Sequence, residues 1–132
     1  MKRVPARLVG GLLLLTACGS PSAPRSSACA GPYPDHATSQ YVLPWRVGET
    51  HRIGQGNCGS GSHAAGTVVQ YAYDMLMPIG TPILASRSGT VFLVEERFTD
   101  GTRTPGQENY VNIVHPDGTI AGYVHLTKTA SL

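Results

Sequence analysis

The chain has 132 residues and a formal net charge of +2, enough for one small domain. Its basic residues form no continuous run and do not alternate with aromatic residues. The composition therefore excludes the usual signature of a nucleic-acid-binding surface.

The first segment has the pattern of a bacterial export signal. Lys2, Arg3 and Arg7 give a positive end, and residues 8–15 form an apolar run that is too short to span a bilayer. The run is followed by Leu15-Thr16-Ala17-Cys18, which resembles a lipoprotein lipobox. We expect removal of residues 1–17 and a lipid on Cys18, which would anchor the protein without a spanning helix. The alternative is an ordinary signal peptide with an incidental cysteine.

Removal of this signal would change the net charge. Lys plus Arg would fall from 10 to 7 while Asp plus Glu stay at 8, which gives −1 for the mature chain. The apparent basicity of the whole sequence therefore belongs to the signal.

Two cysteines remain if Cys18 carries a lipid. Cys29 and Cys58 could form a disulfide, because exported chains meet oxidising conditions. The loop of roughly 30 residues would then contribute about 3–4 kcal/mol on the chain-entropy model. The alternative is two free thiols.

Residues 18–40 are rich in Ser, Pro, Ala and Gly, and they predict a flexible tether before a domain at residues 41–132. Trp45, the only tryptophan, is expected at the edge of this domain. A short strand is expected within residues 47–53. The glycine-rich residues 54–61 predict a loop that delivers His63.

Residues 69–75 alternate in polarity, which predicts a half-buried strand with Asp74 opposite the aromatic row. Pro78, Gly80 and Pro82 should end this strand, and residues 84–85 should lead into a second strand that Gly89 separates from residues 90–95. The polar residues 97–108 predict a long loop.

A β-hairpin is expected at the end of the chain. Strands at residues 109–115 and 120–126 flank Pro116-Asp117-Gly118-Thr119, a typical turn sequence. The prediction is an all-β domain, a small antiparallel sheet over residues 41–127. The alternating rows give its expected core: Val69, Tyr71, Tyr73, Val91, Leu93, Val111, Ile113 and Val124.

Several short segments carry a resemblance to a known family. They are Ser62-His63, Ala72-Tyr73-Asp74, Met77-Pro78, Gly80-Thr81-Pro82, Ala85, Gly89, Val91 and Tyr123-Val124-His125-Leu126. In this combination they resemble the lysostaphin-type (LytM-like) zinc metallopeptidases, which cut peptide cross-bridges of bacterial cell walls. The resemblance covers roughly residues 48–127.

The resemblance implies both a fold and a chemistry. His63 and Asp74 would be two of three zinc ligands, and His125 would stabilise or protonate the developing oxyanion beside the metal. The implied substrate is peptidoglycan, and the implied location is the bacterial cell envelope with a lipid anchor in the membrane.

The chain departs from the family in two ways. Many members have His-x-Gly-x-Asp, whereas Asp74 follows His63 by 11 positions here. The family's closing His-x-His segment should lie beyond Leu126, but the sequence ends at Leu132 and residues 126–132 offer no His, Cys, Asp or Glu. The predicted fold is thus incomplete at its C-terminal side, with weakly bound or absent zinc and little hydrolysis.

The predicted hairpin argues against His115 as a substitute for the missing ligand. A turn centred near Asp117 places His115 opposite Thr119 and His125 opposite residue 109, so the two histidines should be about 20 Å apart along the hairpin. His36 and His51 precede the motif, and nothing in the sequence indicates that either lies near His63 and Asp74.

Two functions remain open. The first is a cell-wall zinc endopeptidase. The second is a non-catalytic lipoprotein that binds peptidoglycan or regulates a hydrolase partner.

Overall fold

The computed structural model describes Cys29, Tyr33 and residues 35–128. The predicted signal and lipobox, including Cys18, lie outside the described residues. Within the described part of the chain, no helix has the length and apolar character needed to cross a membrane.

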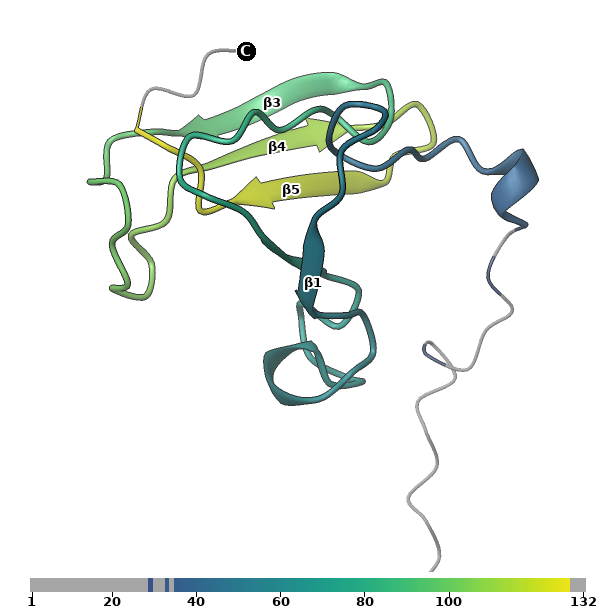
Figure 1. The fold of residues 1–132 in the computed structure, drawn as a ribbon, viewed down its shortest axis with the longest axis horizontal. Helices are drawn as coiled ribbons and strands as arrows, with labels where there is room; N and C mark the ends of the chain where they lie inside the picture. Colours follow the sequence, from purple (N-terminus) through teal and green to yellow (C-terminus); the bar gives the residue numbers. More distant parts are fainter. Residues whose placement is uncertain (1–28, 30–32, 34, 129–132) are drawn as a thin grey trace, which may run out of the picture.

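Two separate antiparallel sheets form the domain (Figure 1). The smaller sheet pairs β1 with β2, and the larger sheet has the order β3-β4-β5. The elements are the 3-10 helices η2 (His36–Thr38) and η3 (Gly61–His63), and the strands β1 (Arg52–Gln55), β2 (Asp74–Leu76), β3 (Thr90–Glu95), β4 (Tyr110–Val114) and β5 (Ile120–Val124). The all-β prediction is confirmed for the described residues.

The β4–β5 hairpin has the predicted register. The His115 amide donates to the Thr119 carbonyl at 2.8 Å, and the Gly118 amide donates to the His115 carbonyl at 2.9 Å. Gly118 has φ +81°, a conformation that glycine adopts without steric cost. The Asp-Gly pair therefore closes the hairpin as its sequence indicated.

One face of the larger sheet forms the core. Opposed residues of paired strands share a face, so Val111 lies beside Tyr123 and Ile113 beside Ala121. The Tyr123 hydroxyl accepts a 2.7 Å hydrogen bond from the Ser86 amide, which places the segment before β3 against this face. Val111 and Ile113 are only 4% and 7% exposed.

The same segment also pairs with the N-terminal arm. The Val42 amide donates to the Ser86 carbonyl at 2.8 Å, and the Leu84 amide donates to the Pro44 carbonyl at 2.9 Å. Residues 84–85 thus make backbone contacts but do not form the strand start that the sequence suggested. Trp45 follows, buried at 8% exposure, and donates its indole N–H to the Glu49 carbonyl.

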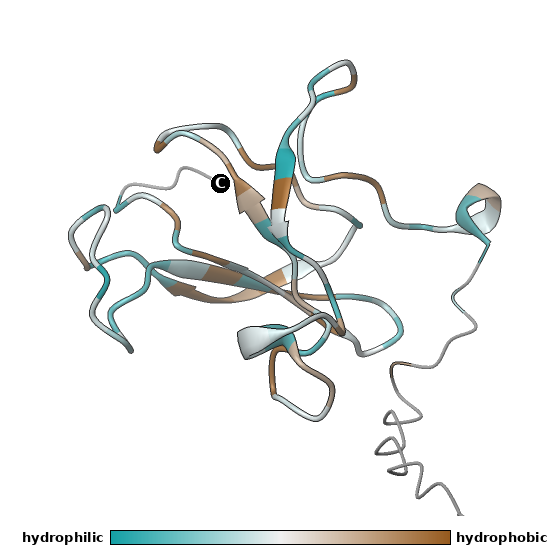
Figure 2. Cartoon of the chain, turned by 60° about the horizontal axis from the view of Figure 1, so that its bottom comes forward, coloured by the Kyte–Doolittle hydropathy of each residue, from teal (hydrophilic) through white to brown (hydrophobic). Residues whose placement is uncertain are grey.

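Most of the predicted core was wrong. Val111 and Ile113 are buried because β4 has a neighbour on both sides, whereas β3 and β5 are the edges of the sheet. The other expected core residues are between 38% and 54% exposed: Val69, Tyr71, Tyr73, Val91, Leu93 and Val124. In Figure 2, hydrophobic residues lie on the connecting segments as well as on the strands.

The expected strand over residues 69–75 was also wrong for most of its length. The strand begins only at Asp74, and residues 67–71 form turns. In these turns the Gln70 amide donates to the Thr67 carbonyl and the Ala72 amide to the Val69 carbonyl. These short-range bonds replace the extended backbone that alternation would require. The strand expected within residues 47–53 lies further along the chain, where it forms β1.

A polar cluster fixes the N-terminal arm to the hairpin turn. Arg87 donates to Asp117 at 2.5 Å and to the Tyr41 hydroxyl at 3.2 Å. The Thr119 hydroxyl donates to the other Asp117 oxygen at 2.7 Å. The hydrogen bonds from Thr119 and then from Arg87 hold the pKa of the Asp117 carboxyl well below its ordinary value.

Candidate functional site

The two expected zinc ligands come from different parts of the smaller sheet. His63 is the last residue of η3, in the loop between β1 and β2, and it is 4% exposed. Asp74 is the first residue of β2, where it pairs with Gln55 of β1. The Asp74 side chain is 56% exposed, so the pair has one buried member and one open to solvent.

Asp74 Oδ1 lies 3.4 Å from His63 Nε2. A charge-assisted N–H···O hydrogen bond is normally about 2.7–2.9 Å long. Two ligands of one tetrahedral zinc, each about 2.0–2.1 Å from the metal, are about 3.3 Å apart. The separation fits two donors around one ion, and it is also the ion-pair distance found between His51 and Glu49.

The second ring nitrogen of His63 gives an independent observation. His63 Nδ1 is buried and has no hydrogen-bond partner in the described structure. A buried polar atom without a partner carries a desolvation cost and needs an explanation. His115 Nε2 is in the same situation, so His63 is singled out only by the approach of Asp74 to its other nitrogen.

His125 does not sit as the sequence predicted. Strand β5 ends at Val124, and His125 follows it with φ +62° in the left-handed region. Its side chain is exposed, and it lies outside the strand that was expected to run over residues 120–126. A non-glycine residue in this conformation is uncommon and occurs at functional sites.

The remaining histidines have other partners. His51 packs edge-on against Trp45, with ring centroids 5.0 Å apart, and its Nε2 lies 3.4 Å from Glu49. His36 is exposed in η2 beside Asp35. His115 is buried, and its Nδ1 lies 2.9 Å from the Ser88 carbonyl oxygen. Among Cys29, Tyr33 and residues 35–128, no group of three or more His, Cys, Asp or Glu side chains is placed to hold a metal ion.

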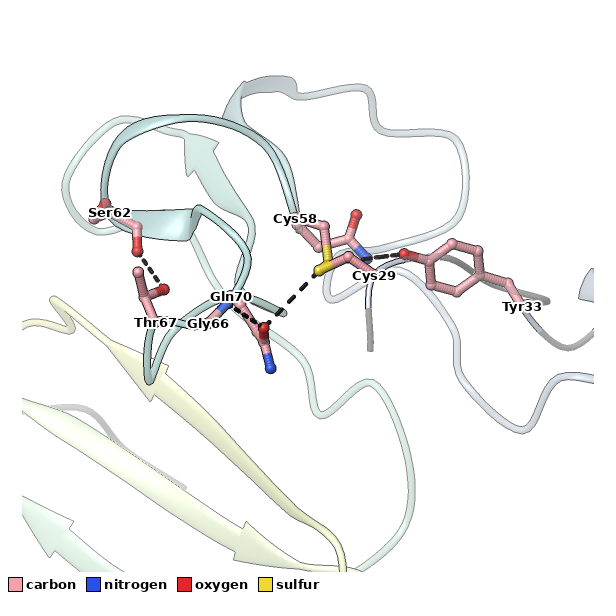
Figure 3. The surroundings of a disulfide bond; sticks show 8 residues. Cys29, Tyr33, Cys58, Ser62, Gly66, Thr67 and Gln70 are labelled. Atoms are coloured by element: carbon pink, nitrogen blue, oxygen red, sulfur yellow. Dashed lines mark hydrogen bonds between the residues drawn. A yellow bond between two sulfur atoms is a disulfide. The ribbon is translucent and has the colours of Figure 1, made fainter. Parts of the chain in front are cut away.

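The structure joins Cys29 and Cys58 by a disulfide, which was one of the two alternatives for these cysteines. Figure 3 shows this bond beside Tyr33 and Gln70; it joins Cys29 to the loop between β1 and β2. Sequence reasoning gave no role to Gln70 or Gln55. Both glutamines hold this loop: Gln55 donates to the Ser62 hydroxyl at 3.1 Å, and the Gln70 side-chain oxygen accepts from the Gly66 amide at 2.7 Å. Only their positions on either side of His63 could have indicated these roles.

Comparison with protein-family models, with curated proteins and with solved structures finds no match to this chain. The arrangement of His63 and Asp74 therefore carries the functional argument.

Proposed function

We propose that this domain is a LytM-like module of the bacterial cell envelope that acts on or binds peptidoglycan peptides. The single observation that supports it most strongly is the approach of His63 Nε2 to Asp74 Oδ1 at 3.4 Å. The two residues are 11 positions apart in sequence, and both belong to the segments that resemble the peptidase family.

The donor set fits part of a zinc site. His63 would supply a ring nitrogen from a buried position, and Asp74 an oxygen from an open one. A zinc ion held there would polarise a carbonyl and lower the pKa of its water. His125, at the end of β5, is the residue we assign to hydrogen bonding with a developing oxyanion.

A catalytic zinc normally has three protein ligands. The described residues supply two at this place, since no group of three candidate ligands forms among them. We therefore propose weak zinc binding and little or no cross-bridge hydrolysis for this chain alone. The two-donor set also favours the second candidate function, a lipoprotein that binds peptidoglycan or regulates a hydrolase.

A peptidoglycan assay separates the two functions. The full chain, Asp74→Asn and the control His36→Ala are each mixed with insoluble peptidoglycan in the presence of zinc. Co-sedimentation of all three proteins without released peptides supports the binding module. Release of peptides that Asp74→Asn abolishes and His36→Ala retains supports the endopeptidase. Neither sedimentation nor release would refute the proposal.

Localisation forms a separate part of the proposal. The Leu15-Thr16-Ala17-Cys18 sequence predicts lipid attachment at Cys18 and a domain held at the membrane surface. Cys18→Ser should release the protein from membranes or leave it unprocessed. Membrane fractionation with mass spectrometry of the N-terminus checks this, and unchanged retention of a processed protein would contradict it.

A further inference from the structure

The loop between β1 and β2 buries little apolar surface. Val68 is 104% exposed, Val69 43% and Tyr71 54%. Such a segment gains little from the hydrophobic effect, which stabilises in proportion to the apolar area that is removed from water. The conformation that presents His63 must therefore depend on polar contacts and on covalent bonds.

Two residues of the loop, Gln70 and Ser62, accept the hydrogen bonds that hold its shape. Gln70 accepts hydrogen bonds from the Cys58 amide at its carbonyl (2.5 Å) and from the Gly66 amide at its side-chain oxygen (2.7 Å). The Ser62 carbonyl accepts a 2.7 Å bond from the Thr67 hydroxyl. Figure 3 shows the bond from Gly66 to Gln70 and the bond between Thr67 and Ser62. These hydrogen bonds connect residues within the loop and do not connect the loop to the larger sheet.

The disulfide lies at the base of this loop. Cys58 precedes His63 by five residues and has φ +49°, a left-handed conformation that costs a non-glycine residue free energy. The disulfide to Cys29 and the hydrogen bond from the Cys58 amide to Gln70 both hold Cys58 in this conformation. Loss of the disulfide would leave one hydrogen bond to oppose the backbone preference of Cys58.

The disulfide is open to reagents. Both cysteines are only partly buried, and they line a cavity of about 350 Å³ together with Gly59 and Ala65. A small dithiol can therefore approach the sulfur atoms without prior unfolding of the sheets.

Asp74 lies outside the cross-linked loop. It is held by the pairing of β2 with β1, in which it opposes Gln55. The disulfide acts directly on the loop that carries His63, whereas Asp74 is held by the hydrogen-bonded ladder. One 3.1 Å hydrogen bond, from Gln55 Nε2 to the Ser62 hydroxyl, joins the loop to this ladder.

We propose that the Cys29–Cys58 disulfide is a redox switch that sets the alignment of His63 with Asp74. In the oxidised form the pair is aligned; in the reduced form the loop moves and the pair separates. A dithiol reductant supplies two electrons and two protons: its thiolate attacks one sulfur to form a mixed disulfide, and its second thiol then closes the reductant's own disulfide and leaves two protein thiols. The consequence for zinc rests on the proposed function, whereas the loop movement does not.

Hydrogen exchange of the full chain, with and without dithiothreitol, tests the switch. Reduction should accelerate exchange at the Cys58 and Gly66 amides by about tenfold or more, because local opening is independent of the larger sheet. Val111 and Ile113 in β4 should change by less than about twofold. The double variant Cys29→Ser/Cys58→Ser should match the reduced protein and not respond to dithiothreitol.

Equal acceleration in the loop and in β4 would overturn the proposal, because the disulfide would then only stabilise the whole domain. Unchanged loop exchange would overturn it as well. Zinc titration of the oxidised protein and of Cys29→Ser/Cys58→Ser, both without dithiothreitol because thiolates themselves bind zinc, separates this inference from the proposed function. Weaker zinc binding in the double variant supports both, and equal binding in the two proteins refutes the switch alone. Loop acceleration without zinc binding in either protein refutes the metal site alone.

Discussion

Gly89, the residue before β3, is closely surrounded by the central strand. A Cβ atom at this position would lie 2.5 Å from Ile113 Cγ2 and from the Val114 carbonyl oxygen, and 3.0 Å from His115 Nδ1. The Val114 oxygen belongs to the backbone of β4 and cannot move without disturbing the pairing of the sheet. Gly89→Ala should therefore cost about 2–3 kcal/mol of unfolding free energy, the upper part of the range for overpacking.

Thermal unfolding followed by circular dichroism measures this cost. For a domain of about 100 residues, 1 kcal/mol corresponds to about 4–8 °C, so Tm should fall by roughly 10–20 °C. The control is Gly56→Ala, because a Cβ atom there meets no atom within 4 Å. Its effect should stay below about 1 kcal/mol. An unchanged Tm for Gly89→Ala, or an equal loss in both variants, would refute the packing argument.

Three further substitutions test the core and the polar contacts. Ile113→Ala should cost about 2–5 kcal/mol, because it leaves a cavity at a side chain that is 7% exposed. Asn109→Ala should cost about 1–3 kcal/mol, because it leaves the Phe98 amide and carbonyl without the partners that they have at 2.9 and 2.8 Å. Asp117→Asn should lower stability above pH 5, and the difference from the unaltered protein should shrink as the pH falls below the ordinary carboxyl value of 3.8.

Each of these has a measurement that can contradict it. For Ile113→Ala the control is Ile120→Ala, which is 60% exposed, and equal urea midpoints for the two variants would refute the assigned core. For Asn109→Ala, an unchanged urea midpoint would contradict the cost assigned to losing its two hydrogen bonds to Phe98. The sign of the pH effect follows from the lowered pKa of Asp117: the folded state binds its proton less readily, so the stabilisation exists above pH 4 and is lost in acid. A difference that grows in acid would contradict it.

The larger sheet could be predicted from sequence because its signals are local. The Asp117-Gly118 pair closes the β4–β5 hairpin, and alternation in β4 agrees with its central position. Local alternation wrongly predicted a strand over residues 69–75, since most of the backbone there forms turns instead of an extended strand. Which strands become edges depends on long-range pairing, so the exposure of Leu93 and Val124 could not be read from their spacing.

The candidate site was predictable in part. The resemblance selected His63 and Asp74, and the structure brings their side chains together. The left-handed conformation of His125 could not be predicted, because nothing in Tyr-Val-His-Leu excludes a longer strand. The means by which the His63 loop is held depends on the Cys29–Cys58 bond, which was left open beside two free thiols.

Zinc titration calorimetry tests the central claim most directly. We predict weak binding of one zinc ion by the oxidised chain, with the affinity lowered at least about tenfold in Asp74→Asn and unchanged in His36→Ala. Because the side chain of Asp74 is exposed, this substitution should leave the fold intact, and circular dichroism checks that. Binding that Asp74→Asn leaves intact, or no binding by the unaltered chain, would contradict the assignment of His63 and Asp74 as zinc ligands.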